Sequence, residues 1–388
     1  MLKTEPTHPN LINDIESLML GISRLTNSTI LAVDTEFMRE KTFMAQLCLL
    51  QLATEDDELL IDPLSGVDLS SLVDVLCDPG IVKVLHAGSQ DLEILFHVLG
   101  QPVTPVFDTQ IAAALLGLPQ QISLAALVRH YTGVDIKKSD TFSDWSVRPL
   151  RPAQLRYALE DVRYLPLIYA SMLTELDSLG RLNWLDEEFK ALSDPGRYQD
   201  SPDKLWQRLK GTSGFSRRQL GILQQLALWR DMTARKRDIP RKWVITDEQL
   251  VDIVRRNPKT IEELYQTRGL SERLSRRVAQ QVINEVDSGR QMPDNELPER
   301  LRKPVIDQDV TASLDLMQAL VHLRANEQHI ASNILAHNSE LQALALGQRH
   351  GLEVLQGWRL ELIGNELIEL LDGRISLSLE QGKLKVDK

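Results

Sequence analysis

Short apolar runs alternate with helical patterns along the first half of the chain. The helical patterns at 69–76 and 90–99 repeat their apolar residues every three or four positions. The apolar runs have the length and the branched side chains that are typical of buried strands. They occur at 29–33, 46–53, 58–62 and 81–87. This alternation predicts an α/β domain over residues 1–195, with a sheet packed by helices.

The rest of the chain has almost no strand signal before its end. Two polar stretches rich in Pro and Gly, 193–202 and 287–304, have the composition of interdomain linkers. They delimit two regions of helical periodicity, 203–286 and 305–388, each predicted to be a small all-α bundle. The tail alternates apolar and polar residues around Gln381–Gly382, which predicts a terminal hairpin.

Composition limits the class of protein. With 388 residues, of which 43% are hydrophobic, the chain can form two or three packed cores. Cys48 and Cys77 are too few and too far apart for a disulfide framework or a zinc site. The sequence has no signal-peptide pattern and no membrane-length apolar stretch, so a cytoplasmic location without membrane attachment is expected. No protein partner is implied.

The distribution of charge changes the picture that the net charge of -11 gives. An acidic protein is a poor partner for nucleic acid, yet residues 203–283 hold 18 Lys and Arg against nine Asp and Glu. This basic region predicts nucleic-acid binding, although it could be a solvated helical surface instead. The residues assigned to binding are Arg217, Arg218, Arg230, Lys236 and Arg237.

The candidate chemistry begins where the first predicted strand ends. Asp34 and Glu36 follow the apolar run 30–33 directly. Two residues apart on a strand, they share one face, and a divalent cation would offset their repulsion. The alternative is that the strand frays after Val33 and both carboxylates are solvated.

Two other stretches add acidic residues. Asp91 falls in the first turn of a predicted helix, at the sheet edge where α/β folds bind ligands, although an acidic residue there also complements the helix dipole. Tyr157 and Asp161, one helical turn apart, share a face that is either a cleft wall or a solvated surface. Together with Asp34 and Glu36 they favour a metal site.

These stretches resemble a known family. D34-T-E36, H86-A-G-S-Q-D91-L and Y157-A-L-E-D161 resemble, in order and spacing, the three motifs of the DEDD 3'-to-5' exonucleases of the tyrosine subclass. Residues 205–258 resemble the helical domain found in RecQ-type helicases. The resemblance implies a ribonuclease-H-like α/β exonuclease domain followed by two small helical-bundle domains, the second strongly diverged.

The resemblance also implies roles for the site residues. Asp34, Glu36, Asp91 and Asp161 would hold two Mg²⁺ or Mn²⁺ ions, which suit phosphodiester hydrolysis. Asp34 would bridge the ions, and Tyr157 would orient the attacking water. His86 and Asp108 have simpler explanations, the first as a structural residue and the second as a helix cap.

The function implied is that of an exoribonuclease that removes nucleoside 5'-monophosphates one at a time from RNA 3' ends, most notably those of tRNA precursors. The preference for RNA rests on the resemblance alone, because both nucleic acids present the same phosphodiester to the metals. A 3'-to-5' DNA exonuclease and a non-catalytic nucleic-acid-binding scaffold are the alternatives. The sequence lacks a phosphate-binding P-loop, so a nucleotide-driven motor is not expected.

Overall fold

The computed structural model describes residues 11–136, 143–199, 201–271, 274–299 and 308–387. Residues 300–307, at the end of the second predicted linker and the start of the last predicted bundle, lie outside the described residues. The chain forms two compact units. One contains the described residues up to Phe37, Leu47–Pro195 and the described residues after Val305. The other contains Met38–Gln46 and Gly196–Pro304.

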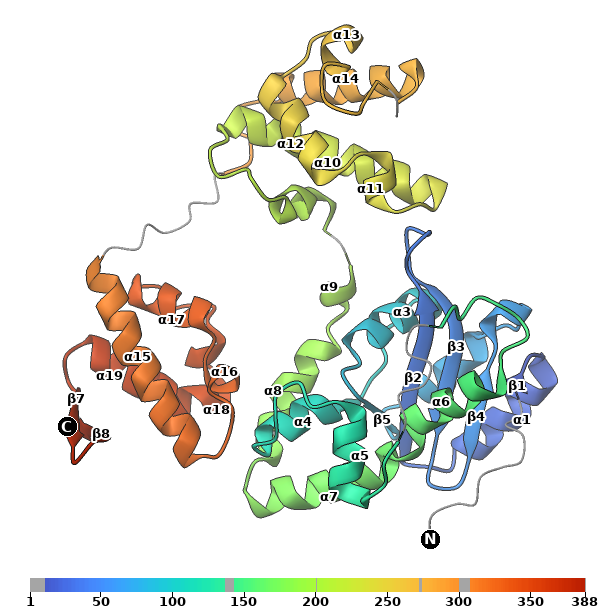
Figure 1. The fold of residues 1–388 in the computed structure, drawn as a ribbon, viewed down its shortest axis with the longest axis vertical. Coiled ribbons are helices and arrows are strands. Elements are labelled where there is room, and N and C mark those ends of the chain that lie inside the picture. Colours follow the sequence, from blue (N-terminus) through green and yellow to red (C-terminus); the bar gives the residue numbers. More distant parts are fainter. Residues whose placement is uncertain (1–10, 137–142, 200, 272–273, 300–307, 388) are drawn as a thin grey trace. The chain divides into compact units, whose positions relative to one another are not determined.

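A six-stranded mixed sheet forms the centre of the first unit (Figure 1). Strands β2, β5 and β6 are parallel, whereas β3 and β4 are antiparallel. The order across the sheet is β1-β4-β3-β2-β5-β6. The strands are β1 (Leu11–Ile12), β2 (Ile30–Met38), β3 (Gln46–Ala53), β4 (Glu58–Ile61), β5 (Val82–Leu85) and β6 (Val106–Asp108).

Strand β2 is longer than its apolar run. Leu31, Ala32 and Val33 are buried, as the sequence predicts. The strand continues to Met38, so that Asp34 and Glu36 are part of its regular backbone. The fraying considered from the sequence does not occur, because β2 is an interior strand with a neighbour on each side.

Helices pack on this sheet through a shared core. The registers set Ala32 beside Val84 and Val84 beside Phe107, and this row packs against Val162 and Ile168 of two helices. Apolar helix faces thereby cover the sheet. The helices are α1 (Ile15–Leu25), α2 (Val73–Leu76), α3 (Ser89–Leu99), α4 (Thr109–Leu115), α5 (Leu124–Thr132), α6 (Pro152–Arg163), α7 (Leu165–Ser178) and α8 (Leu182–Leu192).

The C-terminal segment belongs to the same compact unit and shares its core. Trp358 stacks on Trp184 of α8, with ring centroids 4.3 Å apart. The buried Arg181 donates to the Gln328 carbonyl at 2.6 Å. The helices of this segment are α15 (Gln308–Glu327), α16 (Ser332–Leu335), α17 (Asn338–Ala345), α18 (Gly357–Arg359) and α19 (Asn365–Leu371), with a π-helical turn at Leu360–Gly364.

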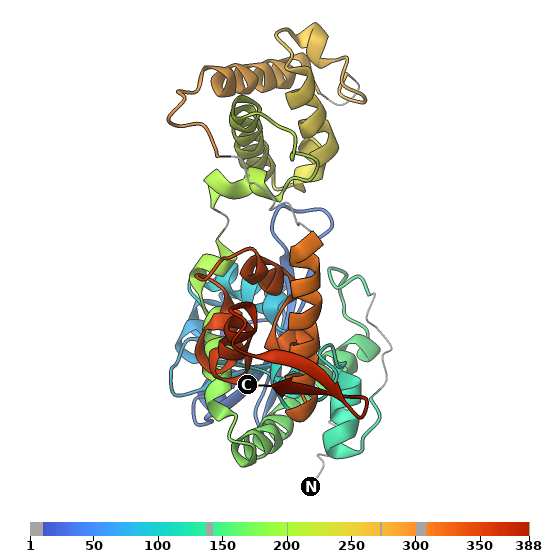
Figure 2. The same ribbon diagram turned by 90° about the vertical axis from the view of Figure 1, so that its left-hand side faces the viewer.

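The chain ends in the two-stranded hairpin that the alternating pattern indicates (Figure 2). Its strands are β7 (Ser376–Glu380) and β8 (Lys383–Asp387). Gln381 and Gly382 both have positive φ, 51° and 79°, as a two-residue hairpin turn requires.

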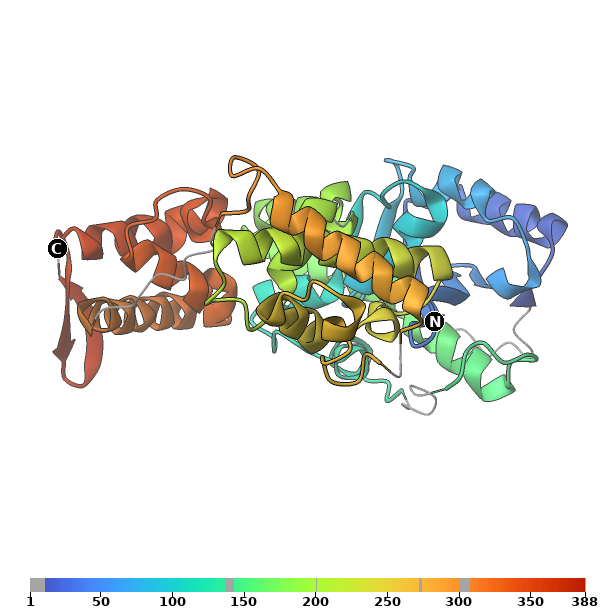
Figure 3. The same cartoon turned by 90° about the horizontal axis from the view of Figure 1, so that it is seen from above.

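Apart from residues 38–46, the described part of the second unit consists of helices and the loops between them. Capping boxes at Ser216 and Thr246 start two of its helices. Helices α10 and α14 lie against each other (Figure 3). A Cβ at Gly289 would lie 2.4 Å from Ile222 Cα, so only glycine permits this approach. The helices are α9 (Pro195–Tyr198), α10 (Arg217–Arg237), α11 (Arg241–Val244), α12 (Asp247–Arg256), α13 (Ile261–Leu264) and α14 (Arg276–Gln291), with a 3₁₀ helix at Pro202–Arg208.

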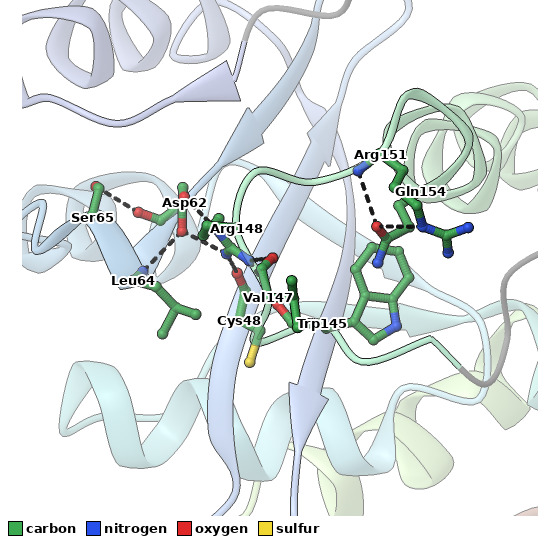
Figure 4. A network of polar contacts seen from close by, with 9 residues as sticks. All are labelled: Cys48, Asp62, Leu64, Ser65, Trp145, Val147, Arg148, Arg151 and Gln154. Carbon is green, nitrogen blue, oxygen red and sulfur yellow. Dashed lines mark hydrogen bonds and ion pairs between the residues drawn. The ribbon is translucent and has the colours of Figure 1, made fainter.

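Arg148 joins the segment before α6 to the sheet (Figure 4). Its guanidinium donates two hydrogen bonds of 2.7 Å to Asp62, which follows β4, and one of 2.6 Å to the carbonyl of Cys48 in β3. The side chain of Asp62 is only 7% exposed. Such a bidentate pair fixes both position and orientation, so Arg148 holds the entry to α6 against two strands.

Arg148→Ala should therefore lower the free energy of unfolding by about 2–4 kcal/mol, because it leaves the Asp62 carboxylate buried without its charge partner. Urea unfolding measures the change. Arg129→Ala is the matched control, since the Arg129–Asp135 pair is 71% and 74% exposed and its loss should matter little. Equal losses in both variants would contradict the role assigned to Arg148.

Candidate active site

Three elements of the first unit carry the residues that the sequence predicts for catalysis. Asp34 and Glu36 lie in β2, Asp91 lies in the first turn of α3, and Tyr157 and Asp161 lie in α6. All five line one pocket of about 550 Å³. The structure therefore brings the three predicted sequence stretches into one site.

Three consecutive residues of β2 contribute to the pocket. Asp34 and Glu36 share one face of the strand, and Thr35 between them also lines the pocket. Thr35 is 5% exposed, and its hydroxyl donates a short hydrogen bond to a carboxylate oxygen of Asp91. One strand thus supplies two carboxylates and also fixes a third. The sequence pattern does not indicate this role for Thr35, because its partner lies 56 residues away.

Asp34, Glu36 and Asp161 make the closest group of carboxylates in the pocket. One oxygen of each lies within 4.8 Å of the other two. Asp91 lines the same pocket outside this group. Carboxylate oxygens are the ligands that Mg²⁺ and Mn²⁺ prefer, so the donor set fits a divalent cation.

Burial and mutual repulsion disfavour the ionised forms of these carboxylates in the metal-free protein. Burial, followed by the charges of Asp91, Asp161 and Glu36, raises the pKa of Asp34 well above its usual range. Burial, followed by the charges of Asp161 and Asp91, raises the pKa of Glu36 to about 8. Burial also raises the pKa of Asp91 to about 6, against the opposing hydrogen bond from Thr35. A bound cation favours the ionised forms and would reverse these shifts.

Known proteins are similar to this chain over nearly its whole length. Residues 9–177 match the 3'-5' exonuclease family, and residues 219–286 match the HRDC domain. The chain is 39% identical over 385 residues to ribonuclease D of Sphingobium indicum, and the match covers 98% of this chain and 99% of that protein. The chain belongs to the ribonuclease D family.

Two further comparisons support the assignment to this family. Ribonuclease D of Zymomonas mobilis is 37% identical over 381 residues, with 97% of each chain covered. The crystal structure of Escherichia coli RNase D, described as an exoribonuclease involved in structured RNA processing, matches with a TM-score of 0.86 and 31% identity. That match covers 95% of this chain and 99% of the other.

Membership confirms two predictions made from the sequence. The chain is a 3'-to-5' exoribonuclease of the ribonuclease D type, and it combines an α/β exonuclease domain with a helical region that contains an HRDC domain. None of the helices in the described ranges combines the length and apolar character that a bilayer crossing requires.

His86 also lines the pocket, and its ring is held by two neighbours. Its Nδ1 lies 2.9 Å from Thr109 Oγ1, and its Nε2 lies 3.0 Å from the Ile122 carbonyl oxygen. Gln110 donates to the same carbonyl at 3.1 Å. His86 therefore ties the end of β5 to the segment before α5, which is the structural role expected from the sequence.

The residues assigned to nucleic-acid binding have different surroundings. Arg230 is 7% exposed and donates to the Ile245 carbonyl and to Asp247. Arg217 and Arg218 donate to backbone carbonyls between positions 292 and 298. Lys236 and Arg237 are exposed in the last turn of α10. The described basic residues thus include both structural arginines and exposed cations.

Sequence reasoning missed part of the pocket wall. Ser123, Leu124 and Ala125, at the start of α5, line the pocket together with Ser89 and Gln90. Ser123 is the N-cap of α5, and its side chain accepts from the Ala126 N–H. The approach of α5 to β2 depends on tertiary packing and leaves no local signal.

Glu36→Gln should stabilise the metal-free protein at high pH. A raised folded-state pKa means that the wild type loses stability as pH rises from about 4.5, the ordinary value, through about 8, because the buried carboxylate must then ionise. The amide of the variant does not ionise, so it adds no such cost to folding at high pH. Thermal unfolding in EDTA should give a Tm several degrees above wild type at pH 8.5, and the difference should shrink toward pH 4.5. Glu361→Gln, at an exposed position, is the control; a difference independent of pH would contradict this reading.

Proposed function

We propose that this enzyme shortens structured RNA from the 3' end, with tRNA precursors among its substrates, and that it does so in the pocket between β2, α3 and α6. The observation that carries this proposal is the group formed by Asp34, Glu36 and Asp161, whose carboxylate oxygens lie within 4.8 Å of one another. Such a half-buried group of acids is costly without a counter-charge, since the charges of Asp161 and Glu36 both raise the pKa of Asp34. A bound cation would offset that cost.

Two Mg²⁺ or Mn²⁺ ions are the proposed cofactors. Asp34, Glu36 and Asp161 would hold one ion, and Asp91 would contribute to the other together with Asp34. When bound, the ions lower the pKa of the attacking water and stabilise charge on the attacking and leaving oxygens. The carboxylates position these charges, and Thr35 keeps the Asp91 carboxylate oriented.

Tyr157 is the proposed partner of the attacking water. It lines the pocket one helical turn before Asp161, so that its phenol and the Asp161 carboxylate face the same space. Its ring lies 6.1 Å from the ring of the buried Trp145, which limits its freedom. A phenol can both accept and donate a hydrogen bond, as orienting a water requires. Attack by that water would release nucleoside 5'-monophosphates.

The choice of RNA follows from family membership and from the E. coli relative, which is described as acting in structured RNA processing. The metal site alone does not distinguish the sugars, because bound ions contact the phosphodiester, which RNA and DNA share. Such RNA lies in the cytoplasm, which is therefore the proposed location.

Asp34→Ala should abolish RNA shortening while folding and RNA binding persist, because it removes a carboxylate shared by both proposed ions. A time course with a 5'-labelled tRNA precursor that carries extra 3' nucleotides measures this, with Mg²⁺ and with EDTA. Single-stranded DNA of similar length is the comparison substrate. Normal shortening by the variant would remove the metal-site argument. Faster loss of DNA would overturn the choice of RNA, and binding without shortening by the wild type would favour a scaffold.

The exposed cations of the helical unit are the proposed RNA contacts. Lys236→Ala with Arg237→Ala should weaken RNA binding about tenfold and reduce the salt slope by roughly two, because each substitution leaves one phosphate without its cation. Fluorescence anisotropy in EDTA at several salt concentrations measures both. Lys383→Ala with Lys385→Ala removes the same charge from the terminal hairpin and is the matched control. If both double variants weakened RNA binding equally, the loss would reflect net charge alone, and the proposed contacts at Lys236 and Arg237 would be wrong.

A further inference from the structure

Asp108 connects two segments that flank the catalytic pocket. It ends β6, is 3% exposed and accepts four backbone N–H groups. Its Oδ1 accepts from Gln110 at 2.8 Å and Ile111 at 3.4 Å, the cap predicted from the sequence. It also accepts from Ala87 at 3.1 Å, while Oδ2 accepts from Gly88 at 2.9 Å. The second pair of bonds goes to the turn that precedes α3, and a helix cap does not need them.

That turn is unfavourable for its sequence. Ala87 has a φ of 56°, in the left-handed region that residues with a Cβ seldom occupy. A Cβ at Gly88 would lie 2.6 Å from Leu85 Cβ, so the next position is tightly packed as well. The start of α3 has no side-chain cap from its own residues. The two hydrogen bonds to Asp108 supply the missing support.

The same turn determines where Asp91 lies. Helix α3 begins at Ser89, and Asp91 is in its first turn, three residues after Gly88. Asp91 lines the catalytic pocket and is buried. A shift of the turn would therefore move this carboxylate relative to Asp34 and Glu36.

Position 108 holds an aspartate, with a carboxylate charge, rather than a neutral asparagine. Capping alone does not require this charge, because asparagine caps helices about as well as aspartate. A carboxylate with four N–H donors on two oxygens, in contrast, can hold both segments at once.

We propose that Asp108 is a positioning residue of this exonuclease: it holds the left-handed turn at Ala87–Gly88 and thereby places Asp91 in the metal site. The proposal rests on the proposed role of Asp91 as a metal ligand. It assigns to Asp108 no contact with RNA or metal.

Asp108→Asn tests this with little change of shape. The amide oxygen can still accept from Ala87, Gln110 and Ile111, whereas an NH₂ group now faces the Gly88 N–H. Loss of an outer support of this kind weakens metal affinity by about 10–100-fold. We expect that loss for Mn²⁺, measured on the full-length protein by electron paramagnetic resonance titration, with an unchanged KM for RNA at saturating Mg²⁺. Unaltered Mn²⁺ affinity would overturn the proposal.

The double variant Asp108→Asn/Ala87→Gly separates geometry from charge. Glycine adopts the left-handed conformation without cost, so the turn should form without Asp108. Mn²⁺ affinity should return to within about threefold of wild type. A folded double variant that stays weak would overturn the turn-holding role. So would a double variant that fails to fold, because glycine needs no such support.

Two further variants make the outcomes distinguishable. Asp14→Asn alters another helix-capping aspartate, which accepts from Ser17 N–H far along the chain from the site, and it should leave Mn²⁺ affinity unchanged. Asp91→Asn tests the premise. If it leaves Mn²⁺ affinity and activity unchanged, the proposed role of Asp91 fails; if it abolishes both while Asp108→Asn behaves like wild type, only the positioning role of Asp108 fails.

Discussion

The repulsion between carboxylates gathered in one partly buried pocket is the constraint on which the rest of the first unit depends. Asp34, Glu36 and Asp161 bring oxygens within 4.8 Å of one another, and burial raises the cost of ionising Asp34 and Glu36. A flexible site would relieve this repulsion by letting the side chains separate. The scaffold must therefore be stiff enough to keep them together until a cation offsets their charge.

The stiffness comes from ties between the sheet and the two helices that carry carboxylates. Helix α6 is anchored at both ends: Arg148 binds Asp62 before its start, and Arg163 in its last turn forms a bidentate pair with Glu58 of β4, at 2.7 and 2.8 Å. Helix α3 is held at its start by Thr35 and by the support of the preceding turn. Each tie is a buried or half-buried hydrogen bond to a charged group, the kind that fixes geometry most strongly.

The helical unit shows that a basic sequence is not the same as a basic surface. Arg230 is neutralised by Asp247 within the unit, and Arg241 pairs with Asp231. The guanidinium groups of Arg235 and Arg241 each lie 4.7 Å from the ring centroid of Phe43, which belongs to the same unit. Part of the positive charge thus stabilises the fold, whereas Lys236 and Arg237 are exposed.

The sequence by itself determined which residues share a face. Asp34 with Glu36, and Tyr157 with Asp161, follow from the periods of strand and helix, and the apolar runs indicated the α/β class. The tertiary structure decided which distant residues these side chains and their neighbours contact. Thr35 binds Asp91 across 56 residues, Arg148 binds Asp62 across 86, and Trp358 stacks on Trp184, which places the C-terminal segment in the core of the first unit. Local spacing determines the direction in which a side chain points. Which residues then meet across such separations depends on burial and on the geometry of the assembled sheet, and no short stretch of sequence contains that information.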